Sequence, residues 1–196
     1  PLAEVLARSV PSAEMGGDLV DAVEREHELD VFLADVSGHG VGAGIVMGML
    51  KASIRTRLLA TGDDLGPVLS DVNRVTTDLT RPEMFATLAC ARVRADRSVS
   101  YALAGHLPIF HFDAGAGRWN RLENEHLPLG IDAGVDFTSG TLRAGPGDLL
   151  VFLTDGLIEV TDAQGEQLGL ESIARLLASL KERTPKAVAD ALLDAA

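Results

Sequence analysis

The chain has 196 residues, of which 46% are hydrophobic, and this is enough apolar material for one ordinary domain with a sizeable core. Its 17 basic and 29 acidic residues give a formal net charge of −12, so the phosphate backbone of a nucleic acid would be repelled. The longest uncharged apolar run, near residues 40–50, is too short to span a membrane. Composition therefore excludes nucleic acid and membrane as partners, and we expect one domain over residues 1–196.

Cys90 is the only cysteine, which excludes internal disulfides and a thiol cluster for zinc or iron–sulfur ligation. A cytoplasmic, reducing location is the expected setting. The chain starts at Pro1 and carries no basic signal region. We therefore expect a piece of a longer polypeptide, which an upstream sensor domain would fit.

Two apolar stretches near the N-terminus predict an antiparallel hairpin. Leu29, Val31 and Leu33 alternate in a strand that runs to Asp35. The short charged link 24–28 connects it to a strand at 18–23. Such a pairing would bring Asp18 close to Asp35.

Helical patterns follow at about residues 41–60 and 65–79. Asp63 or Asp64 can cap the second helix, and Pro67 is tolerated in its first turn. The apolar positions of the first helix are Ile45, Met49, Ile54 and Leu58. Its glycines, each costing about 0.8–1 kcal/mol relative to alanine, predict close packing on a sheet or a flexible start: Gly42, Gly44 and Gly48.

Residues 85–154 change to strands separated by turn-forming residues, arranged like a meander. The expected strands are 85–93, 99–104, 109–112, 119–122, 137–142 and 149–154, with hairpin turns at 95–98, 113–117 and 144–148. Helices at about 170–181 and 185–193 close the chain. Because strands and helices occur in blocks, the pattern predicts an α+β protein, with antiparallel sheets stacked between helices.

Three aspartates stand at the ends of apolar runs or beside glycines: Asp18, Asp35 and Asp155. A buried strand end fixes a carboxylate, and a neighbouring glycine lets a ligand approach the backbone. Converging carboxylates repel one another unless a cation neutralises them, and magnesium or manganese prefers such oxygen ligands. Each aspartate alone is more simply explained as a turn or helix cap, but the three together favour a metal site.

Several short motifs in this order resemble the PPM phosphatases, in their bacterial stage II sporulation protein E and stress-response (RsbU-like) branch. The motifs span about residues 11–177. They are Gly16-Gly17-Asp18, Ala34-Asp35-Val36-Ser37-Gly38-His39-Gly40-Val41, Phe85-Ala86-Thr87-Leu88, Ala104-Gly105-His106-Leu107-Pro108, Leu127-Pro128-Leu129-Gly130, Gly147-Asp148 and Thr154-Asp155-Gly156-Leu157-Ile158-Glu159.

The resemblance implies a four-layer αββα sandwich with two divalent cations, manganese or magnesium. By resemblance, Asp35 bridges both ions, Asp18 and the carbonyl of Val36 hold one, and Asp155 holds the other. The three aspartates would be the catalytic residues, and a metal-bound water the nucleophile. The implied activity is hydrolysis of phosphoserine or phosphothreonine on a protein. The implied substrate is a STAS-type anti-anti-sigma factor, so the implied role is signal transduction in sigma factor regulation.

Two alternatives stay open: a pseudophosphatase that binds partners without turnover, and a hydrolase of small phosphoesters, which would need a deep pocket. A Ser–His–Asp triad from Asp35, Ser37 and His39 is disfavoured because all three share one tight loop. His39 either orients phosphate or water or stabilises its loop, and His106 is interpreted as structural.

The family pattern normally closes with a strand carrying a further aspartate. Asp190 and Asp194 lie in a helical pattern instead and are interpreted as solvated helix residues. We therefore expect residues 1–196 to lack that last strand and to bind the ion shared by Asp35 and Asp155 weakly.

Overall fold

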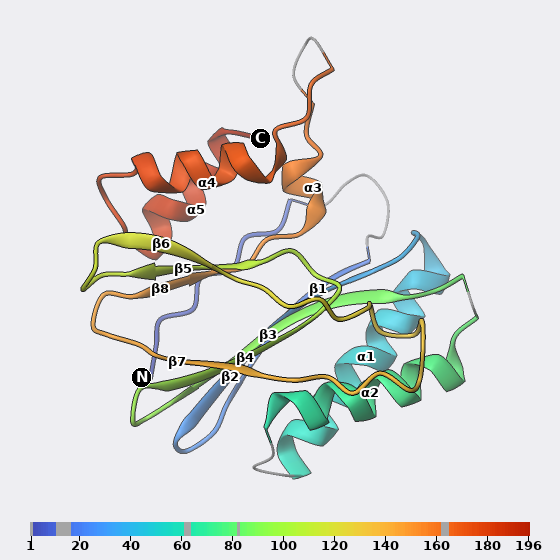
Figure 1. Ribbon diagram of the computed structural model, residues 1–196. Helices are drawn as coiled ribbons and strands as arrows, with labels where there is room; N and C mark the ends of the chain where they lie inside the picture. Colours follow the sequence, from blue (N-terminus) through green and yellow to red (C-terminus); the bar gives the residue numbers. More distant parts are fainter. Residues whose placement is uncertain (1, 11–16, 61–63, 82, 162–164) are drawn as a thin grey trace.

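The computed structural model describes residues 2–10, 17–60, 64–81, 83–161 and 165–196 (Figure 1). Two residues singled out from the sequence, Gly16 and Asp63, lie outside these ranges. Among the described helices, none combines the length and the apolar character needed to cross a membrane.

The described strands form two antiparallel sheets. The larger sheet has the strand order β1-β2-β3-β4-β7, and the smaller sheet has the order β6-β5-β8. The strands of the larger sheet are β1 (Asp18–Glu24), β2 (Glu28–Val36), β3 (Ala86–Arg94), β4 (Ser98–Ala104) and β7 (Gly140–Arg143). Those of the smaller sheet are β5 (Ile109–Asp113), β6 (Arg118–Leu122) and β8 (Leu149–Val151).

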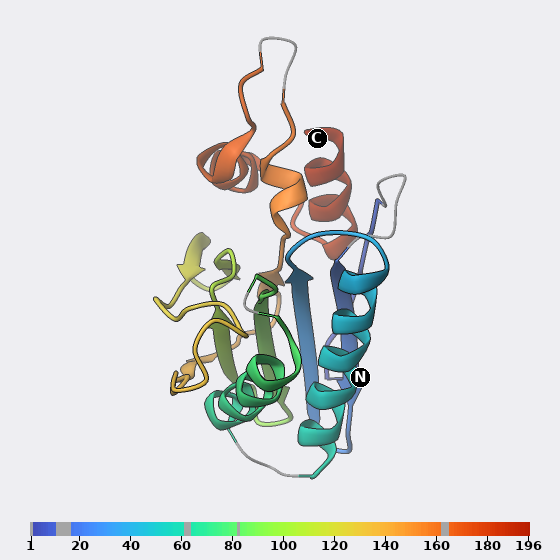
Figure 2. The ribbon, with the colours of Figure 1, turned by 90° about the vertical axis from the view of Figure 1, so that its right-hand side faces the viewer.

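Helices cover the outer face of each sheet, which gives four layers (Figures 1 and 2). The larger sheet carries α1 (Val41–Ala60) and α2 (Leu65–Leu79), and the smaller one carries α4 (Gly169–Ser179) and α5 (Pro185–Asp194). A short helix, α3 (Asp155–Ile158), follows β8. The expected α+β sandwich, with two antiparallel sheets between helices, is confirmed.

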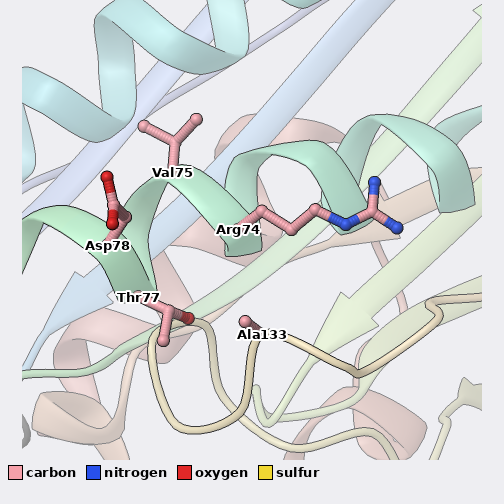
Figure 3. A pocket seen from close by; sticks show the side chains of 5 residues that line it. All are labelled: Arg74, Val75, Thr77, Asp78 and Ala133. Carbon is pink, nitrogen blue, oxygen red and sulfur yellow. The ribbon is translucent and has the colours of Figure 1, made fainter.

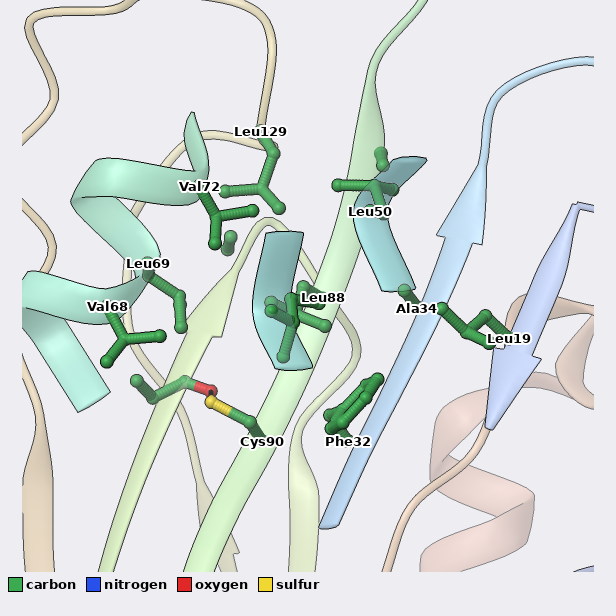
Figure 4. Close-up of a cluster of buried hydrophobic side chains, with 14 of the residues drawn as sticks. Leu19, Phe32, Ala34, Leu50, Val68, Leu69, Val72, Leu88, Cys90 and Leu129 are labelled. Atoms are coloured by element: carbon green, nitrogen blue, oxygen red, sulfur yellow. Dashed lines mark hydrogen bonds between the residues drawn. The ribbon is translucent and has the colours of Figure 1, made fainter. Parts of the chain in front are cut away.

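The larger sheet carries buried apolar side chains on both faces. Since successive side chains of a strand point to opposite sides, neighbouring residues pack in different clusters. Phe32, Ala34 and Leu88 pack with α1 and α2 in the main core (Figure 4). The neighbouring residues Ala89 and Leu103 pack instead with Ile109 of the smaller sheet. Cys90 lies in the main core and donates its thiol to the carbonyl of Ala102 at 3.5 Å.

Helices α1 and α2 have the expected bounds, but two details of α1 differ from expectation. Ile45 is 60% exposed, and the buried side is formed by Ala43, Val46, Leu50, Ile54 and Leu58. A Cβ atom on Gly42 or Gly48 would meet no atom within 4 Å, so close packing does not explain these two glycines. In α2, the side chain of Asp64 accepts a hydrogen bond from the Leu65 N–H at 2.9 Å, which confirms the cap at Asp64.

The predicted meander is wrong after β4, because β4 and β5 belong to different sheets and do not pair. Strand β7 pairs with β4 of the larger sheet, whereas β8 pairs with β5 of the smaller sheet. The turn at 144–148 therefore carries the chain between sheets instead of closing a hairpin. Strand β7 is also shorter than predicted, because Phe137 lies outside it and packs in the main core. β8 ends at Val151, so Asp155 begins a short helix instead of ending a strand.

A buried ion pair lies at the end of β2 opposite to Asp35. Arg92 and Asp30 face each other on β3 and β2, with 2.6 Å between Nε and Oδ1, and both are almost fully buried. Arg25 also bonds to Asp30 and donates to the carbonyl of Leu58 in the last turns of α1. These charge-assisted bonds fix the C-terminal end of α1 to the sheet.

Candidate functional site

Asp18 and Asp35 are partners in the β1–β2 register. Their strand neighbours Leu19, Ala34 and Val36 are buried in the core under α1 and α2. Because side chains alternate along a strand, the two aspartates lie on the other face of the sheet. The predicted hairpin therefore brings the two carboxylates together on the face turned toward the second layer.

Thr154 and Asp155 reach this place from the other layer. Thr154 is the N-cap residue of α3, and its hydroxyl donates to Oδ2 of Asp18 at 3.1 Å. Asp155 is the first residue of α3, and its carbonyl accepts the N–H of Glu159 at 2.9 Å. The step from β8 into α3 thus ties residues 154–159 to the end of β1.

The electrostatics of the site show that the carboxylates crowd one another. Burial, followed by the charges of Asp155, Asp18 and Glu159, raises the pKa of Asp35 to about 6. Burial also raises the pKa of Asp18; the charge of Asp155 adds to this, while the Thr154 hydroxyl opposes it. Raised carboxyl pKa values mean that the ionised forms lack a compensating positive charge.

Gly17 is buried where β1 passes close to the end of β2. A Cβ atom at this position would lie 2.3 Å from the carbonyl oxygen of Val36 and 3.0 Å from Oδ1 of Asp35. No side chain fits there, so only glycine allows the two strands to approach this closely. The main chain is tied in place by a hydrogen bond of 3.2 Å from the Val36 N–H to the Gly17 carbonyl.

The loop after β2 is fixed by its main chain. The Ser37 N–H donates to the carbonyl of Phe85, and the Phe85 N–H donates to the Ser37 hydroxyl, both at 2.9 Å. Gly38 and Gly40 have φ values of 88° and 80°, which side-chain-bearing residues rarely adopt. His39 lies between these glycines and is exposed.

His106 lies in the connection between β4 and β5. Burial lowers its pKa to about 4, although the charge of Asp155 opposes this. Its Nε2 atom is buried and has no hydrogen-bond partner among the described residues. The imidazole is therefore neutral near pH 7, and the charge of Asp155 acts on it.

The structure makes Asp18 and Asp35 direct cross-strand partners, and the charge of Asp155 acts on both. Within the described ranges, no three His, Cys, Asp or Glu side chains are grouped tightly enough to enclose an ion. Asp190 and Asp194 lie in or at the end of α5, as expected for helix residues.

A groove of about 540 Å³ lies elsewhere, on α2 and the loop around Ala133 (Figure 3). Arg74, Val75, Thr77 and Asp78 form its other walls, and none of the three aspartates lines it. This groove is therefore not the deep pocket at the aspartates that a hydrolase of small phosphoesters would need.

Two contributors to the site were not singled out from the sequence. The hydroxyl of Thr154 bonds to Asp18, and the charge of Glu159 raises the pKa of Asp35. Both belong to the motif at residues 154–159. Thr154 and Glu159 are the N-cap and C-cap residues of α3, and the sequence pattern, which predicts a strand at 149–154 and no helix after it, gives no signal for their roles.

Solved structures define the class of the fold. The chain matches the PP2C phosphatase domain of SpoIIE from Bacillus subtilis with a TM-score of 0.75 and 22% identity, covering 91% of this chain and 52% of that one. It matches the RsbU and RsbW domains of Rv1364c from Mycobacterium tuberculosis with a TM-score of 0.78 and 28% identity, covering 95% and 52%. The fold is that of the PP2C phosphatase domains.

Sequence comparison gives the family. Residues 25–196 match stage II sporulation protein E (SpoIIE), and the chain therefore belongs to the SpoIIE family. The phosphoserine phosphatase RsbU of Bacillus subtilis is 31% identical over 163 residues, which are 83% of this chain and 48% of RsbU. The chain spans about half the length of these relatives. A relative named as a phosphatase does not support the pseudophosphatase alternative.

Proposed function

We propose that this chain is the catalytic domain of a metal-dependent phosphatase that hydrolyses phosphoserine or phosphothreonine on a regulatory protein. The observation that carries the proposal is the opposition of Asp18 and Asp35 on a SpoIIE-family fold, where the charge of Asp155 also acts on Asp35. Three carboxylates without a positive partner are suited to bind cations and unsuited to bind phosphate alone.

The types of oxygen donor present, three carboxylates and a main-chain carbonyl, suit divalent cations, manganese or magnesium. Carboxylate and carbonyl oxygens are the ligands that such hard cations prefer. The carbonyl oxygen of Val36 and Oδ1 of Asp35 both lie close to Gly17. We assign Asp35 as the ligand shared by both ions, Asp18 and the Val36 carbonyl as ligands of one, and Asp155 as a ligand of the other.

Bound cations would supply Lewis acidity, which activates water and neutralises the charge of the phosphate. The chain's own residues position the reactants. Asp18 and Asp35 are held by a paired β-ladder, and the Thr154 hydroxyl orients Asp18 by its hydrogen bond. Rigid strand ends of this kind keep ligands within the narrow tolerance that catalysis demands.

We further propose a STAS-type anti-anti-sigma factor as the substrate and sigma factor regulation as the role. Similarity to RsbU, over about half of its length, supports this choice. Asp18 is exposed and Asp35 is half-buried, and a site at the surface suits a phosphorylated residue of a protein better than a small ester. The cytoplasmic location stays a prediction.

Release of phosphate from a phosphoserine peptide and from a phosphorylated STAS-domain protein, with and without manganese, tests the proposal. We expect manganese-dependent turnover, faster on the protein, and its loss in Asp35→Asn. Asp96→Asn is the matched control, because Asp96 only caps the β3–β4 turn through Ser98. Turnover by Asp35→Asn equal to that of the Asp96 control would overturn the assignment.

A further inference from the structure

We propose that His106 is a further residue of the catalytic centre, whose Nε2 atom hydrogen-bonds an oxygen of the phosphate or of a water beside Asp155. This inference rests on the proposed function, because it assumes that cations and phosphate bind at the aspartates. The motif that contains His106 is not otherwise used by the proposed chemistry.

The first support is an unsatisfied polar atom. Nε2 of His106 is buried and has no hydrogen-bond partner among the described residues. A buried nitrogen without a partner destabilises the fold, so native structures rarely keep one without a reason. A histidine retained only for structure would be expected to bond through both ring nitrogens to neighbouring groups.

The second support is position. The charge of Asp155 acts on His106, and the charge of Asp155 also acts on Asp18 and Asp35. The charge of Asp155 thus reaches His106 as well as the two opposed aspartates, which links the imidazole to the proposed catalytic centre.

The third support is rigidity. Gly105 has a φ of +59°, and a Cβ atom there would lie 2.5 Å from Cγ of Pro128. Its N–H donates to the carbonyl of His126 at 3.0 Å. The adjoining strand residues Ala104 and Ile109 are fully buried. The backbone that carries His106 is thus fixed before any ligand binds, as a positioned catalytic group requires.

Substitution separates this role from a structural one. In His106→Leu we expect kcat for a phosphoserine peptide to fall about tenfold, the effect of one lost hydrogen bond. The melting temperature of the metal-free protein should stay the same or rise, because an unpaired buried nitrogen is removed. His106→Gln, which keeps a polar group, should recover part of the activity. His27→Leu, at an exposed hairpin position, is the matched control and should change neither quantity.

A drop in the melting temperature of His106→Leu with unchanged kcat would overturn the proposal. If both quantities fall, NMR of the wild-type protein with nitrogen-15-labelled histidine decides. A shift of the Nε2 resonance of His106 with magnesium alone identifies a water oxygen as its partner, and a shift only after adding inorganic phosphate identifies a phosphate oxygen. An Nε2 resonance unchanged by both overturns the proposal.

Calorimetric titration of the wild-type protein with magnesium distinguishes a failure of the proposed function from a failure of the role of His106. If the protein binds no magnesium and releases no phosphate, the proposed function fails. If it does both while His106 responds to neither ligand, only the role of His106 fails.

Discussion

Asp18 lies directly opposite Asp35 across the ladder between β1 and β2. Like charges placed opposite each other destabilise a strand pair, and here burial and the nearby Asp155 add to the effect. A site that is unfavourable in isolation becomes favourable when cations bind, so metal binding and stability should be coupled.

This coupling predicts the behaviour of Asp35→Asn without metal. Because the pKa of Asp35 is raised to about 6, the folded state prefers its protonated form, and ionisation above that pH destabilises the fold. At pH 8 in chelator, we expect Asp35→Asn to melt at the same temperature as wild type or higher. Manganese should raise the melting temperature of wild type only. A variant clearly less stable than wild type in chelator would indicate a structural role for Asp35.

Gly17→Ala should damage both the hairpin and the site. Its Cβ atom would lie 2.3 Å from the Val36 carbonyl oxygen, so β1 and β2 must shift, at a cost of about 1–3 kcal/mol. We expect a weaker calorimetric affinity for manganese together with a lower free energy of unfolding. Gly115→Ala serves as the control, since its Cβ atom would have an ordinary contact with Asp113 at 3.4 Å. Equal manganese affinity in the two variants would contradict the assignment of Val36 and Asp35, which lie close to Gly17, as metal ligands.

Gly48→Ala tests whether movement of α1 matters. A Cβ atom there meets nothing within 4 Å, so alanine should stabilise the helix by about 0.8–1 kcal/mol. If α1 shifts relative to the aspartates when the phosphatase is activated, the variant should alter manganese binding or activation. In free energy, that change should be larger than the gain in the free energy of unfolding. A gain in unfolding free energy with unchanged manganese binding would leave Gly48 without a role in activation.

Asp148 predicts an acid-dependent contribution to stability. Burial raises its pKa, but bonds from the N–H groups of Ala114 and Gly145 and from His111 outweigh burial and lower it overall. The carboxylate therefore stabilises the fold above the unfolded pKa of about 3.9, and this contribution is lost as the pH falls through the lower folded value.

We expect Asp148→Asn to lose about 1–3 kcal/mol of unfolding free energy at pH 7. Denaturant titrations of the two proteins should converge below about pH 4. A difference that is independent of pH would show that the charge of Asp148 is not responsible.

The sequence predicted the hairpin that positions Asp18 and Asp35, because alternation from Leu29 to Leu33 and a short charged link leave few other pairings. It also predicted α1 and α2 within their observed bounds. Local pattern specified these elements because their neighbours in the chain are their neighbours in space.

Non-local features were not predictable in the same way. Alternation in residues 137–142 and 149–154 indicates strands but does not specify which sheet each one joins. The helix α3 has only 4 residues, too few to show a helical period, so the sequence pattern places Asp155 at the end of a strand. The exposure of Ile45 depends on where α1 meets the sheet, which its own sequence does not encode.

The most direct test of the account is anomalous diffraction at the manganese edge from crystals soaked with manganese. We predict two anomalous peaks flanking the carboxylate of Asp35, each within roughly 2–2.5 Å of its oxygen ligands, one beside Asp18 and the Val36 carbonyl and the other beside Asp155. Manganese bound elsewhere, with no peak at Asp35 at saturating concentration, would contradict the account.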